Sequence, residues 1–330
     1  MKKITISFAV VLIPIFAGAW EVMPEKAPAP IENPMSVEKI ELGKKLYFDP
    51  RLSADGTVSC NTCHNVMGSG TDNLPFSKGI KGQLGGRNAP TVWNSAFWSV
   101  QFWDGRAATL EDQAKGPMIN PVEMGNKDHI AVIQNLKKIP GYVKEFEKVF
   151  GGTDSLTIDN TAKAIAAYER TLITPNSAFD RYLKGDKKAM TSDAIKGMDL
   201  VKTVGCTACH SGPHFAGPAM PIGQGFYMKF PTFTDNNFEK KYHFSKDLGR
   251  YETTQLESDK NMFRVQSWRN ISETSPYFHN GSVSTLDEAV RVMAKTQLNK
   301  NLKAMEVKEI VAFLKSLKGE FPRQTEPLLP

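Results

Sequence analysis

The sequence predicts a mainly α-helical protein built from two tandem, related domains. Apolar residues recur at helical spacing in five segments, at residues 37–47, 129–139, 160–173, 285–294 and 307–317. Strand-like alternation of apolar and polar residues is scarce and short. A cysteine motif and a longer segment each occur once in either half of the 330-residue chain, which indicates an internal duplication.

The first residues have the pattern of a secretory signal peptide. Lys2 and Lys3 precede an apolar run at residues 4–16, and small residues follow up to Ala19. We expect residues 1–19 to be the signal peptide, cleaved after Ala19, which would place the mature protein in the periplasm. An uncleaved membrane anchor is the alternative, although the apolar run is short for a membrane span.

The mature chain is long enough for two domains. A proline-rich lead-in occupies residues 22–34, and the polar stretch 183–193 is the expected boundary between domains at 20–182 and 183–330. The formal charge falls from +6 to +4 when Lys2 and Lys3 leave, so charge says little about partners. No cluster of basic and aromatic residues suggests nucleic acid as a partner.

Every cysteine of the chain belongs to one of two Cys-x-x-Cys-His motifs. The motifs are Cys60, Cys63 and His64 in the first half and Cys206, Cys209 and His210 in the second half. This pattern is typical of covalent c-type haem: the thiols bind the porphyrin edge and the histidine ligates the iron. A four-cysteine zinc site or two disulfides are the alternatives, but neither explains the two histidines. The predicted fold is therefore two cytochrome-c-like domains, each with one covalent haem, joined by long loops.

The second copy of the duplicated segment suggests an electron-transfer haem. Residues 94–112 align with residues 270–288 without insertion, and both segments end in a capping-box helix start, at Thr109 and Thr285. Met293 falls on the helix that starts at Thr285, where its sulfur would complete a His/Met iron. It could equally be a core residue. The competing methionines are Met220, Met228, Met262 and Met305.

The first copy lacks a methionine at the position that matches Met293, because Pro117 stands there. We expect Gln113 and Glu123 in the surrounding loop, beside an iron that is free to bind a small substrate. Such a glutamate could move protons on a bound peroxide. A solvated loop carboxylate is the alternative, and ligation by Met118 would block catalysis.

Several stretches resemble one family along nearly all of the mature chain. They are residues 87–92, 101–106, 113–117, 167–175, 276–281 and 312–315. On these residues the chain resembles the bacterial di-haem cytochrome c peroxidases. The resemblance implies that the first haem reduces hydrogen peroxide to water, with Gln113 and Glu123 in the distal pocket.

The resemblance also implies roles in electron delivery and metal binding. The haem on His210 and Met293 would receive electrons from a small cytochrome c or a blue copper protein (cupredoxin), and Trp103 would lie between the haems. His279 matches a position near the second haem. Asn88, Thr274 and Pro276 match the positions that bind calcium between the domains. The family is usually a homodimer.

One departure from the family concerns the first haem. Most members carry a loop histidine that ligates this iron in the resting enzyme, and reduction of the second haem displaces it. Ile80 stands at that position, with Lys81 beside it, and no histidine occurs between His64 and His129. We expect an open first haem in the oxidised enzyme, with Lys81, Met67 or Met118 as alternative ligands.

Three other readings remain at this point. A non-catalytic di-haem electron carrier would need both irons saturated. Enzymes of a related type, which oxidise residues of a partner protein, use a tyrosine on the second haem, whereas no tyrosine follows Tyr277 here. A haem sensor would bind peroxide without steady turnover. His214 follows the second motif closely, and we expect it to pack near the porphyrin edge.

Overall fold

The computed structural model describes residues 20–330, so the predicted signal peptide lies outside the described residues. The described chain is mainly helical, with one two-stranded antiparallel sheet that pairs Tyr227 with Arg264. The helices are α1 Val37–Phe48, α2 Cys60–Cys63, α3 Leu110–Ile119, α4 His129–Lys137, α5 Pro140–Phe150, α6 Ile158–Glu169, α7 Ala178–Leu183, α8 Ser192–Val204, α9 Asn237–Tyr242, α10 Tyr251–Thr254, α11 Leu286–Leu298 and α12 Ala304–Ser316. The strands are β1 Tyr227–Lys229 and β2 Met262–Arg264. The predicted mainly α class is confirmed, and the five predicted helices correspond to α1, α4, α6, α11 and α12.

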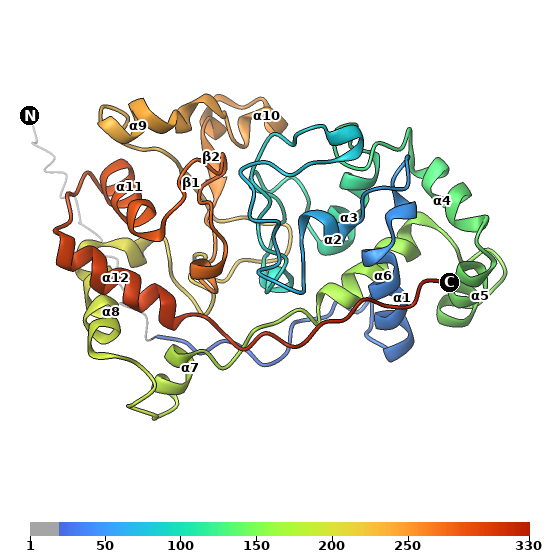
Figure 1. Cartoon of the computed structure of the whole chain (residues 1–330), viewed down its shortest axis with the longest axis horizontal. Coiled ribbons are helices and arrows are strands. Elements are labelled where there is room, and N and C mark those ends of the chain that lie inside the picture. Colours follow the sequence, from blue (N-terminus) through green and yellow to red (C-terminus); the bar gives the residue numbers. More distant parts are fainter. Residues whose placement is uncertain (1–19) are drawn as a thin grey trace, which may run out of the picture.

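Two large clusters of buried apolar side chains form most of the interior of the described chain, and a small third cluster contains Ala96, Leu110 and Ala166. The first cluster is built mainly by α1 and α3–α6, and the second by α7, α8, α11, α12 and the sheet. Figure 1 shows the two groups of helices at opposite ends of the long axis, with long loops between them. This arrangement is compatible with two tandem domains.

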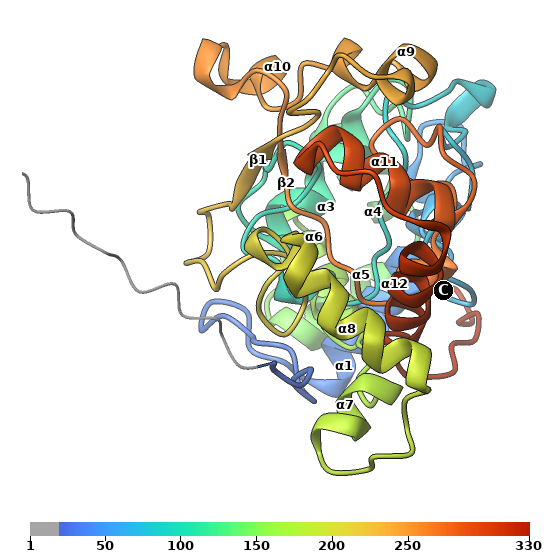
Figure 2. The same ribbon diagram turned by 90° about the vertical axis from the view of Figure 1, so that its left-hand side faces the viewer.

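In each half, the first long helix packs against the last long helix, and a glycine lies at the contact. α1 packs on α6 and α8 packs on α12, and Figure 2 shows the second pair side by side. A Cβ at Gly43 would collide with the main chain of Ala164, and a Cβ at Gly197 would collide with that of Glu309. Only glycine permits this close approach of two helices. Both halves therefore pack their first and last long helices in the same way.

The aligned segments also share their backbone conformation. Asn94 and Asn270 both have positive φ, at 67° and 60°. Their side-chain amides donate to the same oxygen, Thr174 Oγ1, over 2.8 and 2.7 Å. The predicted helix starts are confirmed, since the Thr109 and Thr285 hydroxyls accept from the amides three residues on. The duplication predicted from sequence is therefore present in the structure.

The two ends of the described chain each pack on the other half. The Trp20 ring contacts Phe179, Phe215 and Phe313 of the second core. At the other end, Phe321 packs edge-on to Trp93 in the first half. Figure 1 shows the C-terminal tail running from α12 across to α1 and α5.

Among residues 20–330, no helix combines the length and the apolar character that crossing a membrane requires.

Candidate haem sites

Both motif histidines are prepared to ligate a metal. His64 Nδ1 lies 2.9 Å from the Pro90 carbonyl oxygen, and His210 Nδ1 lies 2.9 Å from that of Phe215. Because a carbonyl can only accept, each Nδ1 carries the proton and each Nε2 keeps its lone pair for a metal. Burial lowers the pKa of His64 and lowers that of His210 to about 4, so both rings stay neutral.

The four cysteines occur as free thiols in two separate places. Cys60 packs against the first core and Cys206 against the second, so the two pairs do not meet. Within residues 20–330, no group of three or more His, Cys, Asp or Glu side chains could hold a metal ion. Because the two cysteine pairs lie against different cores, the four-cysteine zinc alternative is wrong, and the donor set fits two separately attached haems.

A large cavity of about 1040 Å³ opens beside the first motif. Its volume is at the upper end of the range for ligand pockets in proteins. Cys60, Cys63 and His64 line it together with Gln113, Glu123 and Trp103. The structure thus brings together the predicted distal residues and the first motif, which lie about fifty residues apart in the chain.

Gln113 lies in the second turn of α3, so the expectation that a loop carries it is wrong. α3 starts at its Thr109 cap and continues through Pro117 to Ile119. Glu123 lies in the turn that follows, where its main-chain oxygen accepts from Ile80 N over 2.8 Å. Asn120 Nδ2 donates to Glu123 Oε1 over 2.8 Å, and burial raises the pKa of this carboxyl. A raised pKa makes a carboxyl hold its proton more readily, which suits a group that both takes and gives a proton.

Trp103 lies where the two halves meet. Its Nε1 donates to the Asn88 main-chain oxygen over 2.8 Å, and its own carbonyl accepts from Arg264 N over 2.8 Å. The indole packs against the second core while it also lines the large cavity. His279 lines the same cavity, with its ring edge-on to Trp103 at 6.2 Å. His279 Nε2 is 3.1 Å from the Phe244 carbonyl oxygen. The ring of His279 is therefore held through Nε2, whereas His64 and His210 are held through Nδ1.

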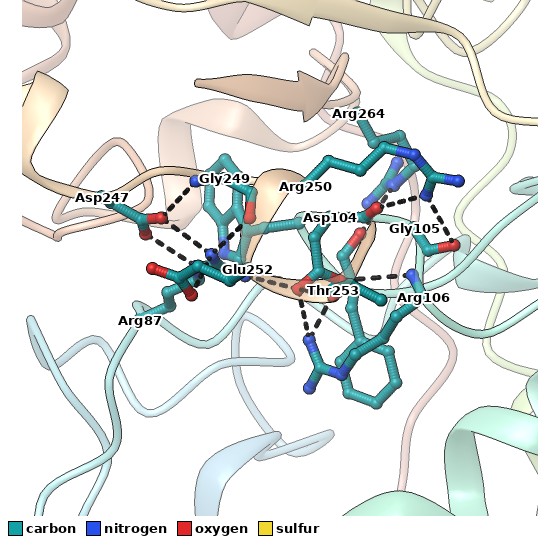
Figure 3. Close-up of polar contacts among 12 residues, drawn as sticks. Arg87, Asp104, Gly105, Arg106, Asp247, Gly249, Arg250, Glu252, Thr253 and Arg264 are labelled. Carbon is teal, nitrogen blue, oxygen red and sulfur yellow. Dashed lines mark hydrogen bonds and ion pairs between the residues drawn. The ribbon is translucent and has the colours of Figure 1, made fainter. Parts of the chain in front are cut away.

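An arginine-centred cluster joins the halves next to Trp103 (Figure 3). Arg87 binds Asp104 of the first half over 2.7 Å. The same guanidinium makes two 2.7 Å bonds to Asp247 of the second half and one of 3.0 Å to Glu252. Arg250 adds a hydrogen bond of 2.8 Å to the Asp104 main-chain oxygen. These charged groups fix the second half against the loop that carries Trp103.

Hydrogen bonds link the segments that carry the three predicted calcium positions. Asn88 N donates to the His279 oxygen over 2.7 Å, and Asn73 Nδ2 donates to the Ser275 oxygen between Thr274 and Pro276. Asn88 Nδ2 donates a hydrogen bond to the Leu74 main-chain oxygen, so Oδ1 is the remaining polar atom of the Asn88 side chain. Among the described residues, no hydrogen bond reaches Asn88 Oδ1 or the carbonyls of Thr274 and Pro276. Three oxygens without donors suit a hard cation.

The alternative ligands of the first iron do not line the large cavity. Ile80 is buried against Gly125, and Lys81 beside it is exposed. Met67 is 50% exposed, and Met118 is buried in the first core. Met124, which the sequence reasoning did not consider, is buried and does line the cavity.

On the second side, Met293 is the one of the five candidate methionines that packs against the second core. It lies on α11, as predicted, whereas Met305 is 58% exposed. The His210 ring stacks on Trp268 with ring centres 4.4 Å apart. The pairing of Met293 with His210 remains a prediction.

Glu169 is a buried acid that the sequence reasoning missed. It ends α6, is 5% exposed, and lines the large cavity. Its Oε2 is buried without a hydrogen-bond partner among the described residues, and burial raises its pKa to about 8. The neighbouring Arg170 directs its two terminal nitrogens to Glu111, and its Nε is also without a partner among the described residues. The sequence signal for this buried acid is its position directly after the run of small and apolar residues at 164–168.

Comparisons with known proteins agree with this geometry. Residues 37–188 match the family model described as di-haem cytochrome c peroxidase. The chain is 44% identical to cytochrome c551 peroxidase of Nitrosomonas europaea, over 96% of this chain and 91% of the relative. It is 46% identical to cytochrome c551 peroxidase of Pseudomonas aeruginosa, over 93% of this chain and 86% of the relative.

A solved structure has the same fold. The crystal structure of a MauG-like protein associated with microbial copper homeostasis superposes with a TM-score of 0.79 at 28% identity, covering 94% of this chain and 99% of the other. The family-model match and the sequence identities show a relationship to these enzymes in sequence as well as in fold. The chain belongs to the di-haem cytochrome c peroxidase family of enzymes, which implies two c-type haems.

Proposed function

We propose that the chain is a periplasmic enzyme that reduces hydrogen peroxide to water in the cavity beside His64. The observation that carries the proposal is the joint lining of this cavity by the first motif, Gln113 and Glu123. The reaction consumes one peroxide, two electrons and two protons and yields two waters. The haem, when bound through Cys60, Cys63 and His64, supplies the iron for peroxide and the path for electrons.

The residues of the chain supply the proton handling. The Glu123 carboxyl takes the proton from one peroxide oxygen and returns it to the other, so that water leaves. Asn120 holds this carboxyl through Oε1, and the buried setting keeps its pKa raised. The Gln113 amide positions the substrate from α3. Related enzymes that oxidise residues of a partner protein use a tyrosine as the ligand of the second haem. Met293 occupies the matching position in this chain, which favours peroxide reduction over oxidation of a partner protein.

Cys206, Cys209, His210 and Met293 would hold the second haem, which would supply a site for accepting electrons one at a time from a small periplasmic cytochrome c or a cupredoxin. Trp103 couples the two haems, with Asn88, Thr274 and Pro276 holding a calcium ion beside it and His279 lying near the second haem. The division at residues 20–182 and 183–330 gives one haem to each domain. We further propose an open first haem in the oxidised enzyme and a homodimer in solution.

The test is turnover of reduced cytochrome c with peroxide by the fully oxidised enzyme, with and without pre-reduction. Equal initial rates support an open first haem. A strict need for pre-reduction means that another residue ligates the first iron. No turnover in either case, with both haems attached, would favour the electron-carrier alternative.

A further inference from the structure

The two halves of the chain differ in the sign of their charge. Residues 20–182 carry 18 Lys and Arg against 19 Asp and Glu, whereas residues 183–330 carry 21 against 16. The positive excess therefore belongs to the half that contains the second cysteine motif. An excess of one sign on part of a surface guides the approach of partners with the opposite charge.

The positive excess is concentrated around the second motif. No Asp or Glu occurs at residues 200–234, which include that motif, or at residues 289–305, which include Met293. Over the whole chain, an acidic residue occurs about once in nine positions. The two acid-free stretches hold six cations: Lys202, Lys229, Arg291, Lys295, Lys300 and Lys303. The two propionates of a bound haem would offset only two of these positive charges.

Hydrogen bonds hold the two acid-free stretches side by side. Lys300 Nζ donates to the Val204 main-chain oxygen over 2.7 Å, two residues before Cys206. Gln297 Nε2 donates to the Lys229 main-chain oxygen over 2.9 Å. Figure 2 views the molecule from the end where α8, α11 and α12 lie, which are the helices that border these stretches. The cations of both stretches therefore belong to one region of the surface.

Four of the six cations are exposed and form no ion pair within residues 20–330. They are Lys202, Lys229, Lys300 and Lys303. The nearby Lys196 and Lys308, which lie outside the acid-free stretches, both pair with acids. The same stretches also expose the apolar side chains of Phe233 and Met305. Exposed apolar groups among charges of one sign suit contact with a protein of the opposite charge.

We propose that the lysine patch formed by Lys202, Lys229, Lys300 and Lys303 docks an acidic electron donor beside the second motif. The proposal rests on the proposed function, because it requires electrons to enter at the second haem. The donor is a small redox protein with acidic side chains around its own redox centre. It loses one electron to the second haem, and no atom is transferred. Attraction between unlike charges speeds association, and exposed ion pairs are weak enough to let the oxidised donor leave.

The experiment measures how fast a reduced donor transfers an electron to the second haem of the oxidised holoprotein, without peroxide. The probe is a small basic cytochrome c in two forms, native and lysine-succinylated, which share a redox centre and differ in the sign of their charge. We expect the succinylated form to react faster at low ionic strength and to slow as salt is added. In Lys229→Glu/Lys303→Glu, its association rate constant should fall about tenfold, while that of the native form should rise.

The matched control is Lys137→Glu/Lys138→Glu at the end of α4, which changes the net charge by the same amount. Both lysines are exposed, and Figure 1 shows α4 at the opposite end of the molecule from α8 and α12. This variant should transfer electrons from both probe forms at rates near those of the wild type. Haem content and helical circular dichroism establish that each variant is folded.

A rate for the succinylated form that depends neither on salt nor on the lysine patch would overturn the proposal. Vesicles of phosphatidylglycerol and phosphatidylcholine test an anionic membrane surface as the other partner. Cosedimentation that is lost in Lys229→Glu/Lys303→Glu, with unchanged electron-transfer rates, would assign the patch to lipid and also overturn the proposal. These measurements use no peroxide. Their failure is therefore distinct from failure of the proposed function, which would appear as absence of peroxide turnover in an enzyme whose second haem is readily reduced.

Discussion

Trp103 and Asn88 are joined by a 2.8 Å hydrogen bond from the indole Nε1 to the Asn88 main-chain oxygen. The Asn88 amide in turn donates to the His279 oxygen over 2.7 Å, which ties it to the second half. The proposed electron relay is therefore attached to the main chain of a proposed calcium ligand. We therefore expect a calcium ion bound at Asn88 to influence the position of Trp103.

Removal of the Asn88 side-chain oxygen should weaken calcium binding and slow electron transfer between the haems. We expect Asn88→Ala to lower calcium affinity at least about tenfold, as changes around metal sites commonly do. Stopped-flow oxidation of the second haem by peroxide, with and without added calcium, measures the effect. Asn135→Ala on α4 is the matched control. Normal transfer in calcium-free Asn88→Ala would contradict the connection.

Replacement of Glu123 by glutamine should remove the proton carrier and keep the shape of the pocket. We expect kcat for peroxide to fall by about 10²–10⁴-fold, the usual range for loss of a general acid–base group. Steady-state turnover with reduced cytochrome c is the measurement. Glu32→Gln, at an exposed residue outside the cavity, should retain the wild-type rate. An active Glu123→Gln enzyme would mean that another group carries the proton.

The candidate replacement ligands of the first iron lie outside the cavity. We therefore expect Lys81→Ala and Met67→Leu to leave the ferric spectrum and the activity of the oxidised enzyme unchanged. The measurement is the high-spin signal of the first haem in the untreated protein. Appearance of a high-spin signal only after one of these substitutions would identify that residue as a ligand.

Glu169 should make the stability of the protein depend on pH. Its pKa is raised from 4.5 to about 8 in the folded state. As pH rises through this window, the unfolded chain releases the proton while the folded chain still holds it, so stability falls. We expect holo Glu169→Gln to lose this part of the decline between about pH 5 and about pH 9, seen in denaturant unfolding. A pH profile parallel to that of the wild type would show that the carboxyl is satisfied once haem is attached.

The Arg87 cluster should carry much of the attachment between the halves. Removing one member of a largely buried ion network leaves its partners uncompensated, and we expect Arg87→Gln to cost about 3 kcal/mol in denaturant unfolding. Lys318→Gln breaks an exposed pair with Glu273 and should cost less than about 1 kcal/mol. Equal losses for both variants would mean that the Arg87 network adds nothing beyond a surface pair.

Local signals in the sequence were sufficient for the motifs and for the helices with clear apolar faces. The two haem motifs, the duplicated segment and the five long helices needed only spacing and capping residues. The placement of Gln113 in a loop was wrong because α3 continues through Gly116 and Pro117 to Ile119.

Long-range polar partnerships could not be predicted from the sequence. Arg87 and Asp247 are 160 residues apart, and nothing near either residue indicates the other. Arg264 likewise reads as an ordinary polar residue until the fold buries it against the Trp98 ring. Burial, which creates the need for a partner, is a property of the assembled halves.

Each end of the described chain packs against the other half of the molecule, which limits how the protein can be divided into separate fragments. Trp20 completes the core of the half that is made later in the chain, and Phe321 covers Trp93 in the half that is made first. A fragment that stops at the repeat boundary would lack the cover of one core and carry an unmatched aromatic residue from the other. We therefore expect the two halves to depend on each other for stable folding, so that neither half would remain fully folded when it is produced alone.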